Sequence, residues 1–154
     1  MTGTSASVRL IERGFAVLPA SVSLQPTASG AWTDTGLQVV LPAAGTYQLD
    51  ATVRASLAGT SPVNTFISGR LFDVTAGAVI PDSEVLVQQV NVTSATAVNV
   101  GNNVSGPIQV EYTVPGARTI RLQGRRTNAA GASTVAQIND NTDGRTTLRF
   151  ARIA

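Results

Sequence analysis

The feature that most constrains the fold is a strict alternation of residue types from Thr46 to Leu57. Polar residues fill the even positions, and the odd positions hold Tyr47, Leu49, Ala51, Val53, Ala55 and Leu57. Successive side chains of a β-strand point to opposite faces. This period of two therefore predicts a long strand with one face in a core and the other toward solvent. The Pro-Ala-Ala-Gly segment before it is a turn signal that ends an earlier strand.

Similar short runs recur along the chain, rich in Val, Thr and Ile and separated by Gly, Pro, Asn and Asp. This composition predicts strands and no helix. The runs are residues 7–12 with 15–18, 21–25, 36–41, 46–57, 64–74, 84–93, 106–114, 118–126, 133–138 and 145–153. About eight to ten antiparallel strands in 154 residues predict an all-β sandwich of the jelly-roll type. We divide the chain into an N-terminal arm or first strand, residues 1–20, and a jelly-roll domain, residues 21–154.

Several predicted strands carry apolar residues on both faces. In residues 66–74, Phe66 and Phe72 share one face, whereas Ile67 and Leu71 share the other. Burying both faces requires a second layer on each side. Charged residues are only 13% of the chain, which is low for an exposed surface. We therefore expect a homo-oligomer. A surface rich in Thr, Ser, Asn and Gln is the alternative explanation of the low charge.

The residue types present exclude several kinds of catalysis. The chain has no Cys, His or Lys, so it has no thiolate or imidazole chemistry and no lysine nucleophile. Its Ser and Thr residues lack the usual base. Asp82 and Glu84 are close in sequence, but we interpret them as exposed acids at the start of a strand and not as a glycosidase pair. We expect no enzymatic activity and no cofactor.

One loop has a metal-like spacing. Asn139, Asn141 and Asp143, followed by Gly144, match the first half of an EF-hand loop, in which alternate oxygens bind Ca²⁺. The bidentate Glu expected at the twelfth position is replaced by Phe150. We predict no metal site here. A hairpin loop of residues that tolerate a left-handed backbone is the preferred interpretation, and a calcium site is the alternative.

Charge is spread unevenly along the chain. Residues 118–154 hold seven Arg and two acidic residues, whereas residues 1–117 hold four Arg and seven acidic residues. A basic segment can bind nucleic acid, but single-strand grooves also need aromatic platforms, and Phe150 is the only aromatic residue in this segment. We expect solvated strand faces instead of a nucleic-acid site. No run approaches the ~20 apolar residues of a membrane span, and the first residues lack the apolar core of a secretory signal.

A more specific pattern runs from Trp32-Thr-Asp-Thr-Gly36 to Ala55. An aromatic residue, Thr-Gly, a short alternating strand, Pro-x-x-Gly-x-Tyr and a long alternating strand together resemble the tumour necrosis factor and complement globular-head superfamily. Residues 108–122 resemble the penultimate hairpin of that superfamily, and residues 147–153 resemble its closing strand, which runs up the middle of the trimer. Aromatic residues are only 5% of the chain. The likeness is therefore to the small trimeric jelly rolls of phage virions, such as head decorations, fibre tips and minor tail proteins.

The resemblance implies a homotrimer that acts as a non-enzymatic structural protein of a phage virion, either a capsid decoration or head fibre or a tail-associated knob. Such a protein is made in the host cytoplasm, and its partners are its own copies and other capsid or tail proteins, with no membrane partner. We predict subunit contacts at Phe66, Phe72, Leu148, Phe150 and Ile153. We predict attachment through the arm at Val8, Leu10, Ile11 and Phe15.

The alternative function is a receptor-binding module. Such a module would recognise a host cell-surface glycan or protein through the loops at residues 27–32, 93–103 and 139–144. Trp32 and Tyr47 could stack on a sugar, although we interpret both as packing at the end of a sandwich core.

Overall fold

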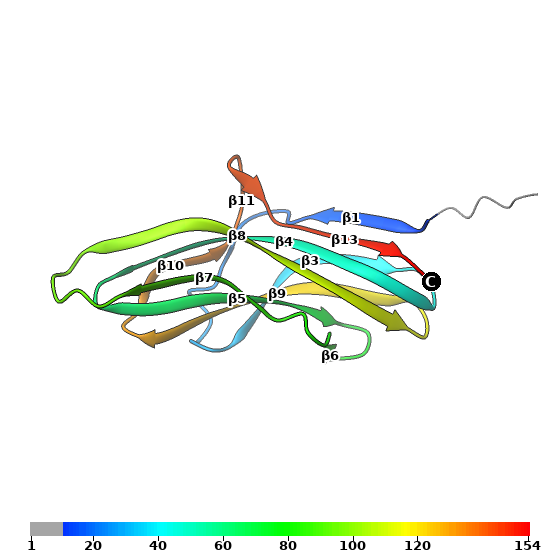
Figure 1. Ribbon diagram of the computed structural model, residues 1–154, viewed down its shortest axis with the longest axis horizontal. Coiled ribbons are helices and arrows are strands. Elements are labelled where there is room, and N and C mark those ends of the chain that lie inside the picture. The colour runs from blue at the N-terminus through cyan, green and yellow to red at the C-terminus, as the bar shows by residue number, and fades with distance from the viewer. Residues whose placement is uncertain (1–10) are drawn as a thin grey trace, which may run out of the picture.

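The computed structural model describes residues 11–154, which form strands and no helix (Figure 1). Four of the thirteen strands have two residues, and the nine longer ones agree with the number expected from the sequence. The strands are β1 (Arg13–Val17), β2 (Val22–Ser23), β3 (Trp32–Leu41), β4 (Gly45–Thr60), β5 (Val63–Asp73), β6 (Ala78–Val79), β7 (Val85–Val92), β8 (Asn99–Val114), β9 (Arg118–Ala130), β10 (Ser133–Ile138), β11 (Asp140–Asn141), β12 (Gly144–Arg145) and β13 (Thr147–Arg152). The predicted all-β class is confirmed. Because no helix forms in residues 11–154, none of the described chain is a membrane-spanning helix.

The first sheet, which we call sheet A, is built around β4. Strand β8 pairs with β4 along its whole length, from Gly45↔Val114 to Thr60↔Asn99. Two collinear strands share the other edge of β4: β13 pairs with its first half and β10 with its second half. Strand β1 extends the sheet beyond β13, and β2 extends it beyond β10. All these pairs are antiparallel, and the long alternating run found in the sequence is the spine of this sheet.

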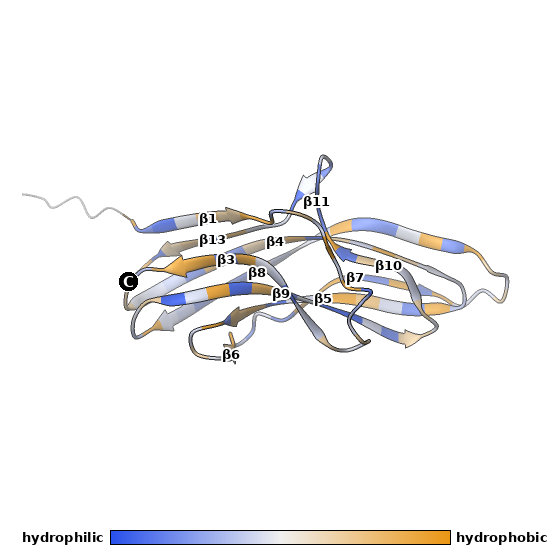
Figure 2. Cartoon of the chain, turned by 180° about the vertical axis from the view of Figure 1, so that it is seen from behind, coloured by the Kyte–Doolittle hydropathy of each residue, from blue (hydrophilic) through white to orange (hydrophobic). Residues whose placement is uncertain are grey.

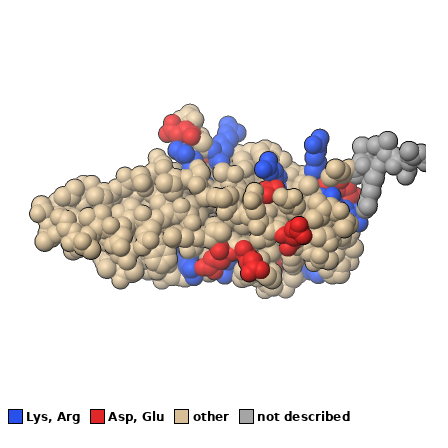
Figure 3. Space-filling model, viewed as in Figure 1, with Lys and Arg blue, Asp and Glu red and all other residues tan. Residues whose placement is uncertain are grey.

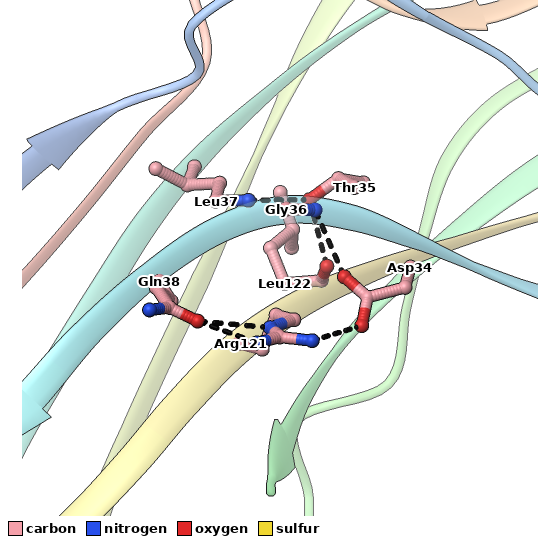
Figure 4. A network of polar contacts seen from close by, with 7 residues as sticks. All are labelled: Asp34, Thr35, Gly36, Leu37, Gln38, Arg121 and Leu122. Carbon is pink, nitrogen blue, oxygen red and sulfur yellow. Dashed lines mark hydrogen bonds and ion pairs between the residues drawn. The ribbon is translucent and has the colours of Figure 1, made fainter.

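The second sheet, sheet B, has the order β3-β9-β5, with β7 and β6 on the far edge of β5. Strand β3 bulges between Asp34 and Gln38, where Gly36 has a φ of 77°. The Gly36 amide donates to Asp34 Oδ1 at 2.8 Å, and the Thr35 hydroxyl donates to the Leu122 carbonyl at 2.7 Å (Figure 4). A left-handed backbone suits glycine. The bulge leaves the alternation unchanged, because Thr35 before Gly36 and Leu37 after it are both buried.

The core lies between the two sheets. The six odd-numbered residues predicted to face inward on β4 are all at most 4% exposed. Bands of opposite hydropathy also alternate along β9 in Figure 2. Tyr47 is fully buried, its ring meets the Phe150 ring edge-on at 5.6 Å, and its hydroxyl donates to the Ala43 carbonyl at 3.0 Å. The interpretation of Tyr47 as a packing residue is therefore correct.

Two predicted subunit contacts belong to this core instead. Leu148 is 0% exposed and Phe150 is 8% exposed within the single chain. Both lie on the inward face of β13, opposite Ala51 and Leu49 of β4. Gly14 faces Phe150 across the β1–β13 pair, and a Cβ at Gly14 would overlap the phenylalanine ring. Alternate residues of β13 point into the core, so these two side chains have little exposed surface for a contact with a partner.

The N-terminal segment contributes a strand to its own sheet. Strand β1 pairs with β13 in register from Arg13↔Ala151 to Val17↔Thr147. Two predicted arm residues, Val8 and Leu10, lie outside the described residues. Ile11 is 68% exposed and Phe15 is 64% exposed. The domain boundary at residue 20 stays a prediction, since β1 is part of the sandwich.

Candidate functional site

Two exposed sheet faces and one buried polar cluster are the features of the described residues that could carry function. We call the outward face of β1, β13 and the first half of β4 the β1–β13 face. On it, Phe15 lies opposite Arg149, and Arg149 lies opposite Asp50 with an Nε–Oδ2 distance of 3.6 Å. These three residues border a pocket of about 350 Å³. Ile153, which directly follows β13, is 50% exposed. This face thus combines exposed apolar side chains with a charge pair.

The outward face of sheet B, which we call the β5–β9 face, is more aromatic. Strand register places Trp32 opposite Arg125 and Arg125 opposite Ser68. The guanidinium carbon of Arg70 lies 4.0 Å from the Trp32 ring centroid, and that of Arg125 lies 4.4 Å from it. Both distances fall within the range of cation–π contacts. Trp32 therefore contacts two guanidinium groups on the outward face of the sheet.

Hydrogen bonds and charges order this cluster. Arg70 Nε donates to Gln123 Oε1 at 2.9 Å, and Arg125 forms an ion pair with Glu84 at 2.5 Å. Partial burial lowers the pKa of Arg70, nearby Glu84 raises it, and the like charge of Arg125 lowers it further. The neighbouring Arg121 forms an ion pair with Asp34 at 2.6 Å (Figure 4).

A pocket of about 400 Å³ opens beside this cluster. Arg125, Glu84 and Ser68 give it polar groups, and Gln89 adds a side-chain amide. Phe66, Val85 and Leu86 give it apolar walls, and Leu86 is 57% exposed. Apolar walls with a few convergent polar groups are typical of ligand sites. The sequence pattern does not show that Arg70, Arg125 and Glu84 belong to one surface. The alternation of residues 66–72 does place Arg70 on the same face as Phe66.

The predicted subunit-contact residues do not lie on one surface. Phe66 and Phe72 are half-buried on the β5–β9 face, as their shared parity predicts. Ile153 lies at the end of sheet A, and Leu148 and Phe150 are in the core. A single flat interface cannot contain all five side chains.

The basic segment near the C-terminus is largely neutralised within the fold. Six of its seven Arg residues form ion pairs with acidic residues, and five of these acids come from residues 1–117. The seventh, Arg126, is 9% exposed and donates to the carbonyl of Thr27 at 2.7 Å. The charge asymmetry along the sequence is therefore not a basic surface patch. One half of the sandwich has no charge at all, since residues 55–69, 85–110 and 127–139 contain no Asp, Glu, Lys or Arg (Figure 3).

The calcium-like loop forms the β11–β12 hairpin. Asn139 is fully buried, and its amide donates to the Ser56 hydroxyl. Asn141 Oδ1 accepts the backbone N–H of Asp143 at 3.1 Å on the exposed turn. The Asn141 oxygen is thus used within the turn, and residues 11–154 contain no cluster of three His, Cys, Asp or Glu residues. The hairpin-loop interpretation agrees with this geometry.

Asp82 and Glu84 also have different environments. Asp82 is exposed, with a φ of 59° in the turn after Pro81, whereas Glu84 is paired with Arg125. The pocket beside Glu84 is not lined by Asp82. The two carboxylates thus do not face each other across a cleft as glycosidase carboxylates do.

The buried polar cluster lies near the β5–β6 turn. Asp73 is 0% exposed, its Oδ1 accepts the Ala76 amide at 2.8 Å, and its Oδ2 accepts the Tyr112 hydroxyl at 2.9 Å. Arg118 Nε lies 3.7 Å from the same carboxylate. Burial raises the pKa of the Tyr112 phenol, the hydrogen bond to Asp73 and its negative charge raise it further, and Arg118 lowers it. This cluster fixes a turn, and every member except Asp73 is partly exposed.

The three loops proposed for receptor binding do not gather at one end. The β7–β8 loop forms the far tip of the sandwich, and the β11–β12 hairpin projects from the middle of sheet A (Figure 1). The loop between β2 and β3 folds over the end of β9, where the Gly30 amide donates to the Arg126 carbonyl at 2.9 Å.

Comparison with solved structures identifies the fold. The chain matches a chain from the structure of infectious bursal disease virus Gx strain, with a TM-score of 0.53 and 11% identity over 99% of this chain and 35% of that chain. It matches the VP2 subviral particle of the same virus with a TM-score of 0.52 and 9% identity, over 99% of this chain and 37% of that one. The chain thus spans about a third of the length of these viral proteins, and the likeness shows a shared jelly-roll sandwich.

A third similar structure is the Eiger TNF of S. frugiperda, with a TM-score of 0.45 and 10% identity over 95% of this chain and 94% of that chain. No protein-family model matches the chain, and no curated protein matches it significantly.

Proposed function

We propose that the chain is a non-enzymatic structural protein of a phage virion, a homotrimeric jelly-roll knob on the capsid or tail. The observation that carries the proposal is the overlay of 99% of the chain on proteins of virus particles, with TM-scores of 0.53 and 0.52. The lack of Cys, His and Lys supports a role without chemistry, because the usual nucleophiles and bases are missing.

The β1–β13 face is the surface that we propose for contact between subunits. Phe15 and Ile153 are 64% and 50% exposed there, and large apolar side chains on a sheet face favour burial against a second copy. The uncharged half of the sandwich supports further contacts with virion proteins, since burying neutral groups avoids the high cost of desolvating charges.

Attachment to the particle is proposed for the N-terminal arm. Ile11 is 68% exposed next to the edge strand β1. An apolar segment that leaves a sheet edge can dock on a neighbouring protein by strand addition.

Sedimentation of the purified chain across a concentration series tests the trimer. We expect a species of three times the 15.8 kDa chain mass. The double variant Phe15→Ser with Ile153→Ser should shift this species toward the monomer. The matched control is Val40→Ser, which removes a 55% exposed apolar side chain from the other sheet and should leave the trimer intact. A wild-type chain that stays monomeric throughout the series refutes the trimer.

Mass spectrometry of purified virions from the host that carries this gene tests the location. We expect the chain to be present in stoichiometric amounts. Its absence from virions would contradict the structural role even if the trimer were found.

A further inference from the structure

We propose that the β5–β9 face holds a binding site for an acidic sugar, a saccharide that carries a carboxylate such as a sialic or uronic acid. This inference does not depend on the virion role or on the trimer. The site consists of the guanidinium groups of Arg70 and Arg125, which both lie against Trp32, and of a neighbouring pocket of about 400 Å³ that Arg125 lines.

The charge balance of the face favours an anion. Its outward side chains include Arg70, Arg121 and Arg125, against only Asp34 and Glu84, so one positive charge is uncompensated. Arg121 and Arg125 each have an acidic partner, whereas Arg70 forms no ion pair with any residue from 11 to 154. The unpaired charge is therefore that of Arg70.

Arg70 also has unused donors that a ligand could reach. Its Nε is bonded to Gln123, but its two terminal nitrogens have no acceptor in the part of the chain that the structure describes. Neither nitrogen is among the buried polar atoms without a partner, so both are accessible. A guanidinium whose Nε is fixed and whose outer nitrogens are free suits a carboxylate oxygen. Stacking on Trp32 at 4.0 Å holds the group in place before any ligand binds.

The pocket suits a sugar ring better than a peptide. Its volume falls within the range of small-molecule sites. Phe66 and Leu86 offer apolar surface for the C–H face of a ring, and Ser68, Gln89 and Glu84 offer hydroxyl, amide and carboxylate partners for sugar hydroxyls. A saccharide ring offers several hydroxyls within one small rigid unit, which matches these closely spaced polar partners.

Titration of the full chain with small acids tests the site by NMR chemical shifts. The probes are N-acetylneuraminic acid and glucuronic acid, with glucose and the methyl ester of glucuronic acid as neutral controls. We expect saturable shifts with at least one acid, centred on the Trp32 indole N–H, and no saturation with either neutral control. Equal responses to the acid and its ester, or no saturable response to either acid, would overturn the proposal.

Variants locate the site. Arg70→Gln should weaken binding of the acid about tenfold or more, because it removes a charge-assisted contact. The matched control is Arg145→Gln, which removes an exposed Arg from the β11–β12 hairpin and should change the affinity less than twofold. Thermal unfolding of both variants checks that they fold, and the comparison of acid with ester on the wild-type chain needs no variant. A Glu-rich hexapeptide that binds through Arg70 while neither sugar acid does would assign the site to an acidic protein and overturn the sugar.

Discussion

Replacing Phe150 by alanine is the sharpest test of which apolar residues form the core of the single chain. The ring is 8% exposed, meets the Tyr47 ring at 5.6 Å and fills the space above Gly14. Truncating a buried phenylalanine costs about 3–5 kcal/mol, including the cavity that is left. The edge-on aromatic pair accounts for about 0.5–1.5 kcal/mol of this. We expect Phe150→Ala to lower the free energy of unfolding by about 3–5 kcal/mol.

Urea denaturation followed by circular dichroism measures this loss. Each variant is unfolded at two protein concentrations tenfold apart, because the stability of an oligomer depends on concentration and that of a core does not. The difference between Phe150→Ala and the wild type should be the same at both concentrations. The comparison variant is Phe66→Ala, whose side chain is half-buried on the outward β5–β9 face and should cost the single chain much less.

Two results would refute this reasoning. One is a loss below about 1 kcal/mol for Phe150→Ala, which is the range of surface substitutions. The other is a loss that grows as the protein is diluted, because that behaviour would place Phe150 in a subunit interface, as first predicted from the sequence. A double-mutant cycle with Tyr47→Leu should give a coupling of about 0.5–1.5 kcal/mol, since the two rings touch.

Three further predictions concern the backbone and one buried cluster. Gly14→Ala should cost about 1–3 kcal/mol in urea denaturation, because its Cβ would overlap the Phe150 ring, whereas Gly116→Ala, with open space around it, should be close to neutral. Asp82 lies at the third position of the Pro81 turn with a φ of 59°, a backbone conformation that favours glycine. Asp82→Gly should therefore unfold at a urea concentration equal to or higher than that of the wild type. Asp82→Val should lower the free energy of unfolding by about 1–2 kcal/mol. The raised pKa of Tyr112 means that the phenol ionises first in the unfolded chain, so wild-type stability should fall as the pH rises above 10. Tyr112→Phe, measured by thermal unfolding from pH 8 upward, should show a shallower fall; an identical slope would contradict the assigned pKa shift.

Much of the fold follows from periodicity alone. The alternation in β4 correctly assigns the inward residues because a period of two leaves only two faces, and the polar face is the outer one. The turn segments between the runs mark most strand ends to within about four residues, but β8 begins at Asn99, seven residues before the run predicted at 106–114. Pairing between distant strands is different. That β13 and β10 share one edge of β4 depends on contacts across about ninety residues, which no local pattern contains.

The same limit explains the errors at the predicted interface. In residues 147–153 one face carries Leu148 and Phe150, and the prediction placed this face toward a partner because the resembling family places its closing strand at the trimer axis. Parity states that two residues share a face but does not state which of two apolar faces is buried in the chain. Gly14 lies opposite Phe150 and leaves space for its ring, which indicates the buried face of β13. This can be seen only when the β1–β13 register is known.

The residues of the candidate binding face are far apart in the sequence, which is why no local pattern predicts this site. Trp32, Arg70 and Arg125 are separated by 38 and 55 residues, and each alone is unremarkable for a strand. Antiparallel pairing of β3, β9 and β5 brings them together. Ion pairs within both sheets and the β11–β12 hairpin neutralise six of the seven Arg residues near the C-terminus. That Arg70 lacks an acidic partner within residues 11–154 therefore becomes clear only when the ion pairs of the other Arg residues are known. Arg70 is held on Trp32, and it forms no ion pair within residues 11–154. A partner with a negative group would therefore pair with a guanidinium that is already positioned.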